Sequence, residues 1–423
     1  MYTLFLRIAF RNLRKNRVFS AINIGGLALG ITAYIFILEY VGFEKSVNQF
    51  HADLPQTYRL INLNTKGETW PQIEPGWGPK MKELFPEVES FCRFEEGVSQ
   101  GIVSRTDTKS EPFREMQIGY VEGNFFDFFT FPLIKGNPVS LQKPNTVFLS
   151  KEASERYFGK ENPVGKSLTL FNQFGKTTYT VEGLFTIPVN SGIQYSMVFS
   201  LETLRNPANL NGNGWAQLDN LSSQYVYTYF KLKKGSQVPV LENRFNEIRK
   251  KLSTNPDGVQ FRLQPMANIH LASSLADTYQ TTGNLKYIYI LSLIAILILA
   301  IAWFNYVNLS TATIFKRANE VGVRKVIGAS QGSLLIQFFM EALVSNVLGF
   351  SVALLLVASL QPSFNGLIGK PLSLQLLVTS PVCWVGFVLL MVGSLLSGTL
   401  AAIRLSGFNP VETLKGKINK TRS

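Results

Sequence analysis

The sequence predicts a membrane protein in which a four-helix transmembrane bundle carries an α+β extracytoplasmic domain, inserted between the first and second transmembrane helices. Of its 423 residues, 46% are apolar and only 16% are charged. Four apolar runs are each long enough to cross a bilayer of about 30 Å, which takes about 20 helical residues. The net charge of +13 is concentrated in the short segments beside these runs.

The apolar runs and their flanks set the predicted boundaries. We expect an amphipathic cytoplasmic helix at 1–17, transmembrane helices at 18–42, 285–307, 334–360 and 376–403, the extracytoplasmic domain at 43–284, a cytoplasmic segment at 308–333, a short outer loop at 361–375 and a cytoplasmic tail at 404–423. The first run is too long for a cleaved signal peptide and lacks a small-residue cleavage site. We therefore interpret it as a retained anchor.

The distribution of charge predicts the orientation of the chain. The two terminal flanks and segment 308–333 together hold 14 Lys or Arg and two Glu, whereas segment 43–284 holds 25 basic and 24 acidic residues. Because positively charged flanks stay in the cytoplasm, both termini are predicted to be cytoplasmic and the large domain to lie outside. A nucleic-acid-binding protein would carry its positive charge on the folded body, so we expect no nucleic-acid partner.

Residues that usually carry catalysis or bind metals are scarce. The sequence contains two cysteines and two histidines, Cys92, Cys383, His51 and His270. These are too few for a disulfide framework, a thiolate metal site or a histidine-rich zinc site. We therefore expect no catalytic, cofactor-binding or metal-binding residue in this chain.

One segment partly matches the sequence motif of a phosphate-binding loop. Gly159 and Gly165 precede Lys166 and Ser167, but five residues separate the two glycines where that loop has four. Pro163 also removes a backbone N–H that such a loop would direct at a phosphate. We therefore predict a turn that leads into a strand.

The segment 43–284 is predicted to mix strands and helices. Alternating and β-branched runs predict strands at 57–62, 89–95, 113–120, 177–185 and 225–232. Helical periodicity predicts helices at 79–84, 151–157 and 240–252, the second after a Ser150 cap. The Asn- and Gly-rich stretch 206–220 predicts a loop. Because the domain begins and ends at membrane helices, its two ends should lie close together.

The cytoplasmic stretch 316–330 is the most informative part of the sequence. Val321, Arg324, Lys325 and Gly328 recur at three- and four-residue spacing, as on one face of a helix. Gly328 then supplies a C-terminal stop, and Ser330 can cap the following helix. A short helix of mixed charge suits docking to a partner. A solvated, positively charged loop explains the same residues equally well.

Small residues recur at helix-packing spacing within the spans. They are Gly26 and Gly30 in the first, Ser345, Gly349 and Ala353 in the third, and Gly393 and Ser397 in the fourth. Small residues let helix backbones approach closely in lipid. Packing within one subunit and packing between two subunits both account for this pattern.

Two acids and four aromatic residues stand out within or beside the spans. Glu39, near the end of the first span, is expected to reach the interface. Glu341 lies deeper and is expected to pair with Arg324, Lys325 or a neighbouring helix. Interfacial anchoring at the two ends of the second span is expected from Tyr287, Tyr289, Trp303 and Tyr306.

Several motifs resemble the FtsX/MacB-type permease domain of ABC transporters. They are the stretch 320–329 (EVGVRKVIGA), with NYVNL at 305–309 before it and FFME at 338–341 after it. The opening at 11–17, with Asn23, Gly26, Leu27 and Gly30, is similar to the start of the same family. Motifs at 124–129, 157–159, 264–271 and 409–412 resemble the MacB-like periplasmic core of Bacteroidota permeases. The resemblance covers essentially the whole chain in the order that the charge pattern predicts.

The resemblance implies a multi-pass permease subunit of the bacterial inner membrane, with a periplasmic core domain. Such permeases work as dimers, and a separate cytoplasmic ABC ATPase, which binds the ATP, docks between the second and third spans. Closure of the ATPase would move the periplasmic domain, a process called mechanotransmission, for efflux or export of peptides, drugs or lipoproteins, or for control of cell-wall hydrolases. By residue-wise carry-over, the coupling element would be Glu320, Gly322, Arg324, Lys325, Gly328 and Ala329.

Some alternatives stay open. Many Bacteroidota relatives carry this unit twice, so the chain corresponds either to a half-size subunit or to a first half. The implied partners are the ATPase, a second permease subunit or half-unit, and membrane lipid, with a periplasmic adaptor or envelope protein as a further candidate. A different reading is a non-transport sensor or scaffold whose outer domain binds an envelope ligand. A membrane-tethered enzyme is disfavoured, because no acid pair or nucleophile elbow is recognisable.

Overall fold

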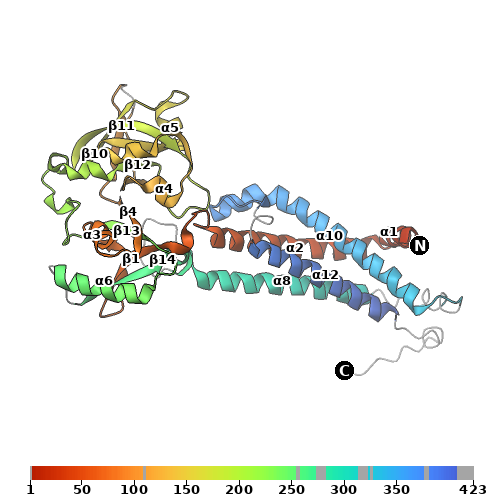
Figure 1. The fold of residues 1–423 in the computed structure, drawn as a ribbon. Coiled ribbons are helices and arrows are strands. Elements are labelled where there is room, and N and C mark those ends of the chain that lie inside the picture. The colour runs from red at the N-terminus through yellow and green to blue at the C-terminus, as the bar shows by residue number, and fades with distance from the viewer. Residues whose placement is uncertain are drawn as a thin grey trace. The chain divides into compact units, whose positions relative to one another are not determined.

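The computed structural model describes residues 2–107, 111–253, 258–272, 283–312, 323, 327–375 and 381–406. The chain forms two compact units (Figure 1). We call Met1–Lys45 with Lys286–Ser423 the helical unit, and Ser46–Leu285 the inserted domain.

The helical unit consists of long apolar helices. Its described helices are α1 (Tyr2–Lys15), α2 (Arg17–Ser46), α8 (Leu285–Ala312), α10 (Gln331–Ile368) and α12 (Pro381–Ser406). By length and composition, three stretches can cross a membrane: Arg17–Ser46, Leu285–Ala312 and Gly332–Ile368. In the expected fourth span, now α12, the apolar stretch within the described residues is the shorter Trp384–Leu396.

Helix α2 lies at the centre of the helical unit. Its buried apolar residues form one cluster with residues of α8, α10 and α12: Leu27, Ala28, Ile31, Ile35, Ala295, Leu299, Ala302, Ala353, Val357 and Leu390. Large apolar side chains on the opposite faces are more than half exposed, among them Ile301, Phe304 and Val385. Helices that are apolar on all faces are typical of a lipid environment.

The inserted domain is built on one mixed sheet of 14 described strands, in the order β14-β1-β13-β4-β7-β12-β9-β11-β10-β5-β6, with β2, β3 and β8 at its sides. The strands are β1 (Thr57–Asn64), β2 (Thr69–Trp70), β3 (Gln72–Ile73), β4 (Val88–Glu96), β5 (Gly101–Arg105), β6 (Phe113–Glu115), β7 (Ile118–Val121), β8 (Leu133–Gly136), β9 (Thr146–Ser150), β10 (Ser167–Asn172), β11 (Gly175–Phe185), β12 (Met197–Ser200), β13 (Val226–Leu232) and β14 (Val259–Pro265). The helices are α3 (Trp77–Leu84), α4 (Phe125–Phe129), α5 (Lys151–Phe158), α6 (Val238–Leu252) and α7 (Met266–Ala272).

The sheet divides into two lobes where β4 meets β7. This pairing spans only three residue pairs, from Phe94 opposite Val121 to Glu96 opposite Gly119. The first lobe holds β1, β4, β13 and β14, with α3 and α6, around a core that includes Trp77. The second lobe holds β5 to β7 and β9 to β12, with α5, around its own core that includes Phe199. A third, aromatic-rich cluster contains residues of both lobes.

The two ends of the inserted domain enter and leave through adjacent strands. Strand β1, which follows α2 in the chain, pairs antiparallel with β14, which precedes α8, from Tyr58 opposite Pro265 to Asn64 opposite Val259. The prediction that the ends lie close together is therefore confirmed.

Most predicted elements of the inserted domain are confirmed, and one is wrong. The helices and strands other than 113–120 are observed within a few residues, and Ser150 caps α5 by accepting a hydrogen bond from the Ala153 N–H at 3.1 Å. The run 113–120 is two strands, because β6 pairs with β5 whereas β7 pairs with β4 and β12. The sequence shows one continuous run because both halves are strand-forming.

Two predicted irregular segments are also observed. Gly165 adopts a φ of +87° just before β10, so the false phosphate-binding loop is a turn that leads into a strand. The loop 206–220 contains the short 3-10 helices Pro207–Leu210 and Gly214–Ala216. Leu210 and Ala216 are buried in the core of the second lobe, which fixes this loop in place.

Candidate functional site

The predicted coupling element is described only at its end. Glu320, Gly322, Arg324 and Lys325 lie outside the described residues, whereas Gly328 and Ala329 lie within them. The Ile327 N–H donates to the Val323 carbonyl at 3.1 Å. Gly328 follows with a φ of +99°, the left-handed conformation in which glycine ends helices.

Ser330 begins the next helix, as its position predicts. Its side-chain oxygen accepts a hydrogen bond from the Ser333 N–H at 3.3 Å and so caps α10. A capping oxygen satisfies one of the N–H groups that have no partner in the first turn of a helix. The coupling segment therefore passes into α10 with only Ala329 between the stop and the cap.

Two apolar residues at this end were missed by the sequence reasoning, which concentrated on charge. Val323 is 50% exposed and Ile327 is 79% exposed. Their four-residue spacing puts them on one face of a helical turn. The spacing of these residues in the sequence could have identified them.

A polar cavity of about 90 Å³ lies among α1, α2, α8 and α10. Its polar lining comes from Asn12, Asn16, Ser20, Asn23, Tyr306, Ser310, Glu341 and Ser345. Glu341 Oε1 accepts hydrogen bonds from Asn12 Nδ2 at 2.6 Å and from Gln337 Nε2 at 3.2 Å. Glu341 therefore pairs with a neighbouring helix, one of its expected partners, and this bond joins α1 to α10.

The aromatic residues at the two ends of α8 differ from one another. Tyr287 and Tyr289 are 63% and 64% exposed, and their anchoring role stays a prediction. Tyr306 is only 4% exposed, and its hydroxyl is hydrogen-bonded with Ser310 and Ser345. The expectation that Tyr306 is an interfacial anchor is therefore wrong, because its face of α8 packs against α10.

The predicted small residues pack helices of this one chain together. A Cβ on Gly26 would lie 3.1 Å from Asn305 Nδ2, and one on Gly30 would lie 2.6 Å from the Ala302 Cβ, so α2 and α8 meet there. A Cβ on Gly349 would lie 3.0 Å from Leu27 of α2, and one on Gly393 would overlap the Trp303 ring. A larger side chain would clash most at Gly30 and Gly393, where the neighbours are a Cβ atom and a Trp ring, whereas flexible side-chain ends face Gly26 and Gly349.

The remaining small residues have different surroundings. Ala353 is fully buried and its carbonyl accepts a hydrogen bond from Thr32 of α2 at 3.4 Å. The Ser345 hydroxyl lines the polar cavity and donates to the Glu341 carbonyl at 3.0 Å. The side chain of Ser397 lies outside the described residues. Packing within one subunit therefore accounts for Gly26, Gly30, Gly349, Ala353 and Gly393, while dimerisation stays a prediction.

Glu39 does not reach the interface, contrary to expectation. Its side chain is fully buried, and Oε2 accepts a hydrogen bond from Gln361 Nε2 of α10 at 2.9 Å. Position along a span does not reveal which face of a helix a residue occupies, and here that face lies against α10.

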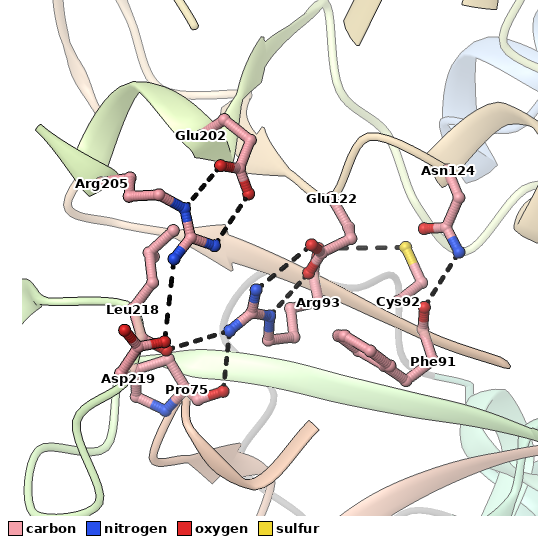
Figure 2. A network of polar contacts seen from close by, with 10 residues as sticks. All are labelled: Pro75, Phe91, Cys92, Arg93, Glu122, Asn124, Glu202, Arg205, Leu218 and Asp219. Carbon is pink, nitrogen blue, oxygen red and sulfur yellow. Dashed lines mark hydrogen bonds and ion pairs between the residues drawn. The ribbon is translucent and has the colours of Figure 1, made fainter. Parts of the chain in front are cut away.

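A buried ion pair joins the two lobes of the inserted domain (Figure 2). Arg93 of β4 is fully buried and donates to both carboxylate oxygens of Glu122, at 2.6 and 3.2 Å. Its remaining nitrogen donates to the carbonyls of Pro75 at 2.8 Å and Leu218 at 3.1 Å. Because Glu122 directly follows β7, this bidentate pair fixes the second lobe to the first.

The surroundings of this pair contain no evident catalytic group. Burial raises the pKa of the adjacent Cys92 thiol, which disfavours the reactive thiolate. Arg205 pairs with Glu202 at 2.7 Å near the surface, and its other nitrogen lies 3.8 Å from Asp219 (Figure 2). Within the described ranges, no three His, Cys, Asp or Glu side chains form a group that could hold a metal ion.

These features define a class: a multi-span membrane protein whose helical unit carries a large α/β domain. Residues 20–248, more than half of the chain, match the MacB-like periplasmic core domain family, and residues 292–410 match the FtsX-like permease C-terminal family. The chain therefore belongs to the family of FtsX/MacB-type permeases.

Curated relatives are larger than this chain. The macrolide export ATP-binding/permease protein MacB of Bdellovibrio bacteriovorus is 27% identical over 188 residues, which cover 44% of this chain and 27% of MacB. A probable syringafactin export ATP-binding/permease protein of Pseudomonas syringae is 27% identical over 153 residues, 34% of this chain and 22% of that protein. The matched part thus spans about a quarter of the length of these relatives.

A solved structure is similar to part of this chain. The periplasmic region of MacB from Actinobacillus actinomycetemcomitans is 16% identical, with a TM-score of 0.37, and the match covers 51% of this chain and 90% of that one.

Proposed function

We propose that this chain is the permease subunit of an ABC transporter and that it couples ATP hydrolysis by a separate cytoplasmic ATPase to movement of its inserted, periplasmic domain. The family membership supports the permease role. The two related proteins named above are export proteins, which supports efflux or export of peptides, drugs or lipoproteins as the task. ATP is bound by the partner, and this chain supplies no catalytic residue.

The observation that carries the proposal is the exposed apolar pair Val323 and Ile327 beside the predicted coupling charges. In the sequence, charged residues flank this apolar pair, and an apolar centre with a polar rim is the composition of a docking site. Gly328 and Ser330 connect this pair to the first turn of α10. A displacement of the docked ATPase would therefore act directly on the N-terminus of a 38-residue helix.

The arrangement of the membrane helices follows from the same proposal. The bundle has four spans, α2, α8, α10 and α12, with both termini in the cytoplasm and α1 at the inner surface. The Asn12 to Glu341 hydrogen bond would make α1 move with α10. A second permease subunit or half-unit completes the transporter, with lipid around it and a periplasmic adaptor or envelope protein as a further partner.

The first test is affinity purification of the tagged chain from native membranes in mild detergent, with identification of the proteins that co-elute and an ATPase assay. We expect an ABC ATPase in fixed ratio. The variant Val323→Asp/Ile327→Asp and the charge reversal Glu320→Arg/Arg324→Glu should each lower its recovery by about tenfold or more, which corresponds to about 1.4 kcal/mol of binding free energy.

The matched control is Val139→Asp in the inserted domain. Val139 is 54% exposed, and this exposed fraction is similar to the 50% of Val323. It should leave the recovery of the ATPase unchanged. An eluate without any ATPase would contradict the transporter and favour the sensor or scaffold. Undiminished recovery with both double variants would reject this docking site.

A further inference from the structure

Buried charged and polar contacts tie α2 to the end of α10, at the opposite end of α10 from the coupling segment. We call Glu39, Glu44, Gln361 and Lys370 the α2–α10 clasp. Glu44 of α2 is buried, and its carboxylate forms an ion pair with the Lys370 ammonium. The same ammonium lies 5.1 Å from the ring centre of Tyr40, in the geometry of a cation–π contact.

The second half of the clasp is an amide network. Gln361 Nε2 donates to Glu39 Oε2 at 2.9 Å and lies 3.2 Å from the Leu372 carbonyl. Asn365 Nδ2 donates to the same carbonyl at 2.8 Å. One turn away, the rings of Phe36 and Phe364 are stacked at 4.3 Å. The chain just after α10 is thereby folded back against the last turns of α10.

The buried charged and polar groups of this clasp make it an energetically unfavourable contact between two helices. Burial of a carboxylate costs several kcal/mol, and its ionic partner often does no more than offset that cost. Glu39 Oε1 and Gln361 Oε1 are buried and have no hydrogen-bond partner among the described residues, which costs further stability. Apolar side chains would join the helices more stably. Of the ionisable groups in the clasp, Glu39 lies within the expected first span, where an ionisable side chain points to a functional role.

The position of the clasp in the chain indicates what that role is. Helix α10 begins at the coupling segment and ends at the clasp, a length of about 57 Å at about 1.5 Å per residue. Helix α2 continues only to Ser46, two residues beyond Glu44. The Ser46 carbonyl accepts a hydrogen bond from Asn190 Nδ2 at 2.8 Å, and Asn48 Oδ1 accepts one from the Gly192 N–H at 2.7 Å. The first residues of the inserted domain, which continue directly from α2, are therefore hydrogen-bonded to its loop at 190–192.

We propose that the α2–α10 clasp is the output joint of this permease: it transfers displacement of α10 to α2, and through Ser46 and Asn48 to the inserted domain. Its four side chains are positioning residues. The inference rests on the proposed function, because the displacement of α10 comes from a docked ATPase.

The test uses the full-length chain with its co-purified ATPase in lipid nanodiscs. Hydrogen–deuterium exchange of segment 46–64 is compared without nucleotide and with ATP plus vanadate. The variant Glu44→Gln/Lys370→Met removes both charges at similar volume, so that no lone buried charge remains. We expect it to reduce the nucleotide-dependent change in exchange by about fivefold or more, the lower end of typical coupling between two sites, while ATP hydrolysis continues.

A second pair and two controls keep the test decisive. Glu39→Ala/Gln361→Ala removes the hydrogen bond between α2 and α10 and leaves no side chain that reaches across, so it should weaken the response as well, even if the first variant does not fold. Lys370→Arg, which keeps the ion pair, should respond like the wild type. Lys80→Met/Glu83→Gln removes an ion pair of the same kind from the surface of α3 and should also respond normally.

The possible outcomes separate the inference from the proposed function. If nucleotide changes the exchange of segment 46–64 in the wild type and changes it by the same amount in both clasp variants, the clasp is not the output joint. If no ATPase co-purifies, or if the wild type itself shows no response, the proposed function is overturned and the inference with it.

Discussion

At the scale of single residues, His51 shows how burial changes the chemistry of a side chain. It is 5% exposed, and its Nδ1 lies 2.5 Å from the Phe129 carbonyl, so Nδ1 carries the hydrogen and donates it. The ring of Phe50 lies 4.0 Å from the imidazole, between ring centres. Burial among aromatic rings disfavours the charged form and lowers the pKa of His51 from 6.5 to about 4.

This shift predicts a dependence of stability on pH. Between pH 6.5 and 4 the unfolded state binds more protons than the folded state, so the contribution of neutral His51 is fully present above pH 6.5 and is lost as the pH falls through 4. The loss is about 3 kcal/mol. We expect the free energy of unfolding of segment 46–285 to fall more steeply in this window for the wild type than for His51→Phe.

The measurement is denaturant unfolding of both proteins at pH 8, 7, 5 and 4. The difference between the two free energies of unfolding should change little from pH 8 to 7, because an imidazole with a pKa of 6.5 or lower is mostly neutral in this range. If the free energies of unfolding of the wild type and His51→Phe changed in parallel down to pH 4, His51 would not be buried in its neutral form.

At the scale of elements, a strong hydrogen bond from Asn12 to Glu341 helps to attach α1 to α10. Asn12→Asp would place a second carboxylate at the 2.6 Å contact, and two carboxylates repel each other at that distance. We expect α1 to separate from α10, with amide exchange in 2–15 faster by about tenfold or more, since a hydrogen bond to a charged group contributes about 1.5–3 kcal/mol.

Asn12→Ala should have a smaller effect, because it removes the bond without adding repulsion. Asn16→Ala is the matched control, since Asn16 lines the same cavity. Exchange of α1 in the Asn12→Asp variant that equals that of the control would show that the bond does not hold the helix. Hydrogen–deuterium exchange in nanodiscs measures the amide exchange of α1 in all three variants.

The elements differ in how well the sequence predicted them. Helices with caps, such as α5 after Ser150 and α10 after Ser330, were predicted at their first residue because the cap is a local hydrogen bond. Strands β6 and β7 were predicted as one, because strand propensity does not reveal that neighbouring segments pair with different partners. Register is decided by packing across the sheet.

At the scale of the whole molecule, the inserted domain depends on a short junction between its lobes. Three residue pairs of β4 and β7 connect the backbones of the two lobes, and the ion pair of Arg93 with Glu122 adds a connection between side chains. Loss of one partner of a buried ion pair leaves the other charge without compensation, at a cost of about 3–5 kcal/mol. We expect Arg93→Met to lower the free energy of unfolding of segment 46–285 by that amount.

The double variant Arg93→Met/Glu122→Leu should recover most of the loss, because no buried charge remains. Arg205→Met is the matched control: Arg205 is 52% exposed in its pair with Glu202, and exposed pairs contribute about 1 kcal/mol or less. Equal losses for Arg93→Met and Arg205→Met in denaturant unfolding would contradict a special role for the junction.

The sequence by itself determined the features that depend on local composition: the long apolar helices, the separate mixed α/β domain, the helix caps at Ser150 and Ser330, and the motifs that resemble the permease family. The tertiary structure decided which side chains meet. It buried Glu39 and Tyr306, joined Asn12 to Glu341 across 329 positions, and brought Lys370 to Glu44. The physical reason is that hydropathy and capping act over a few residues, whereas these contacts depend on how whole helices and strands pack.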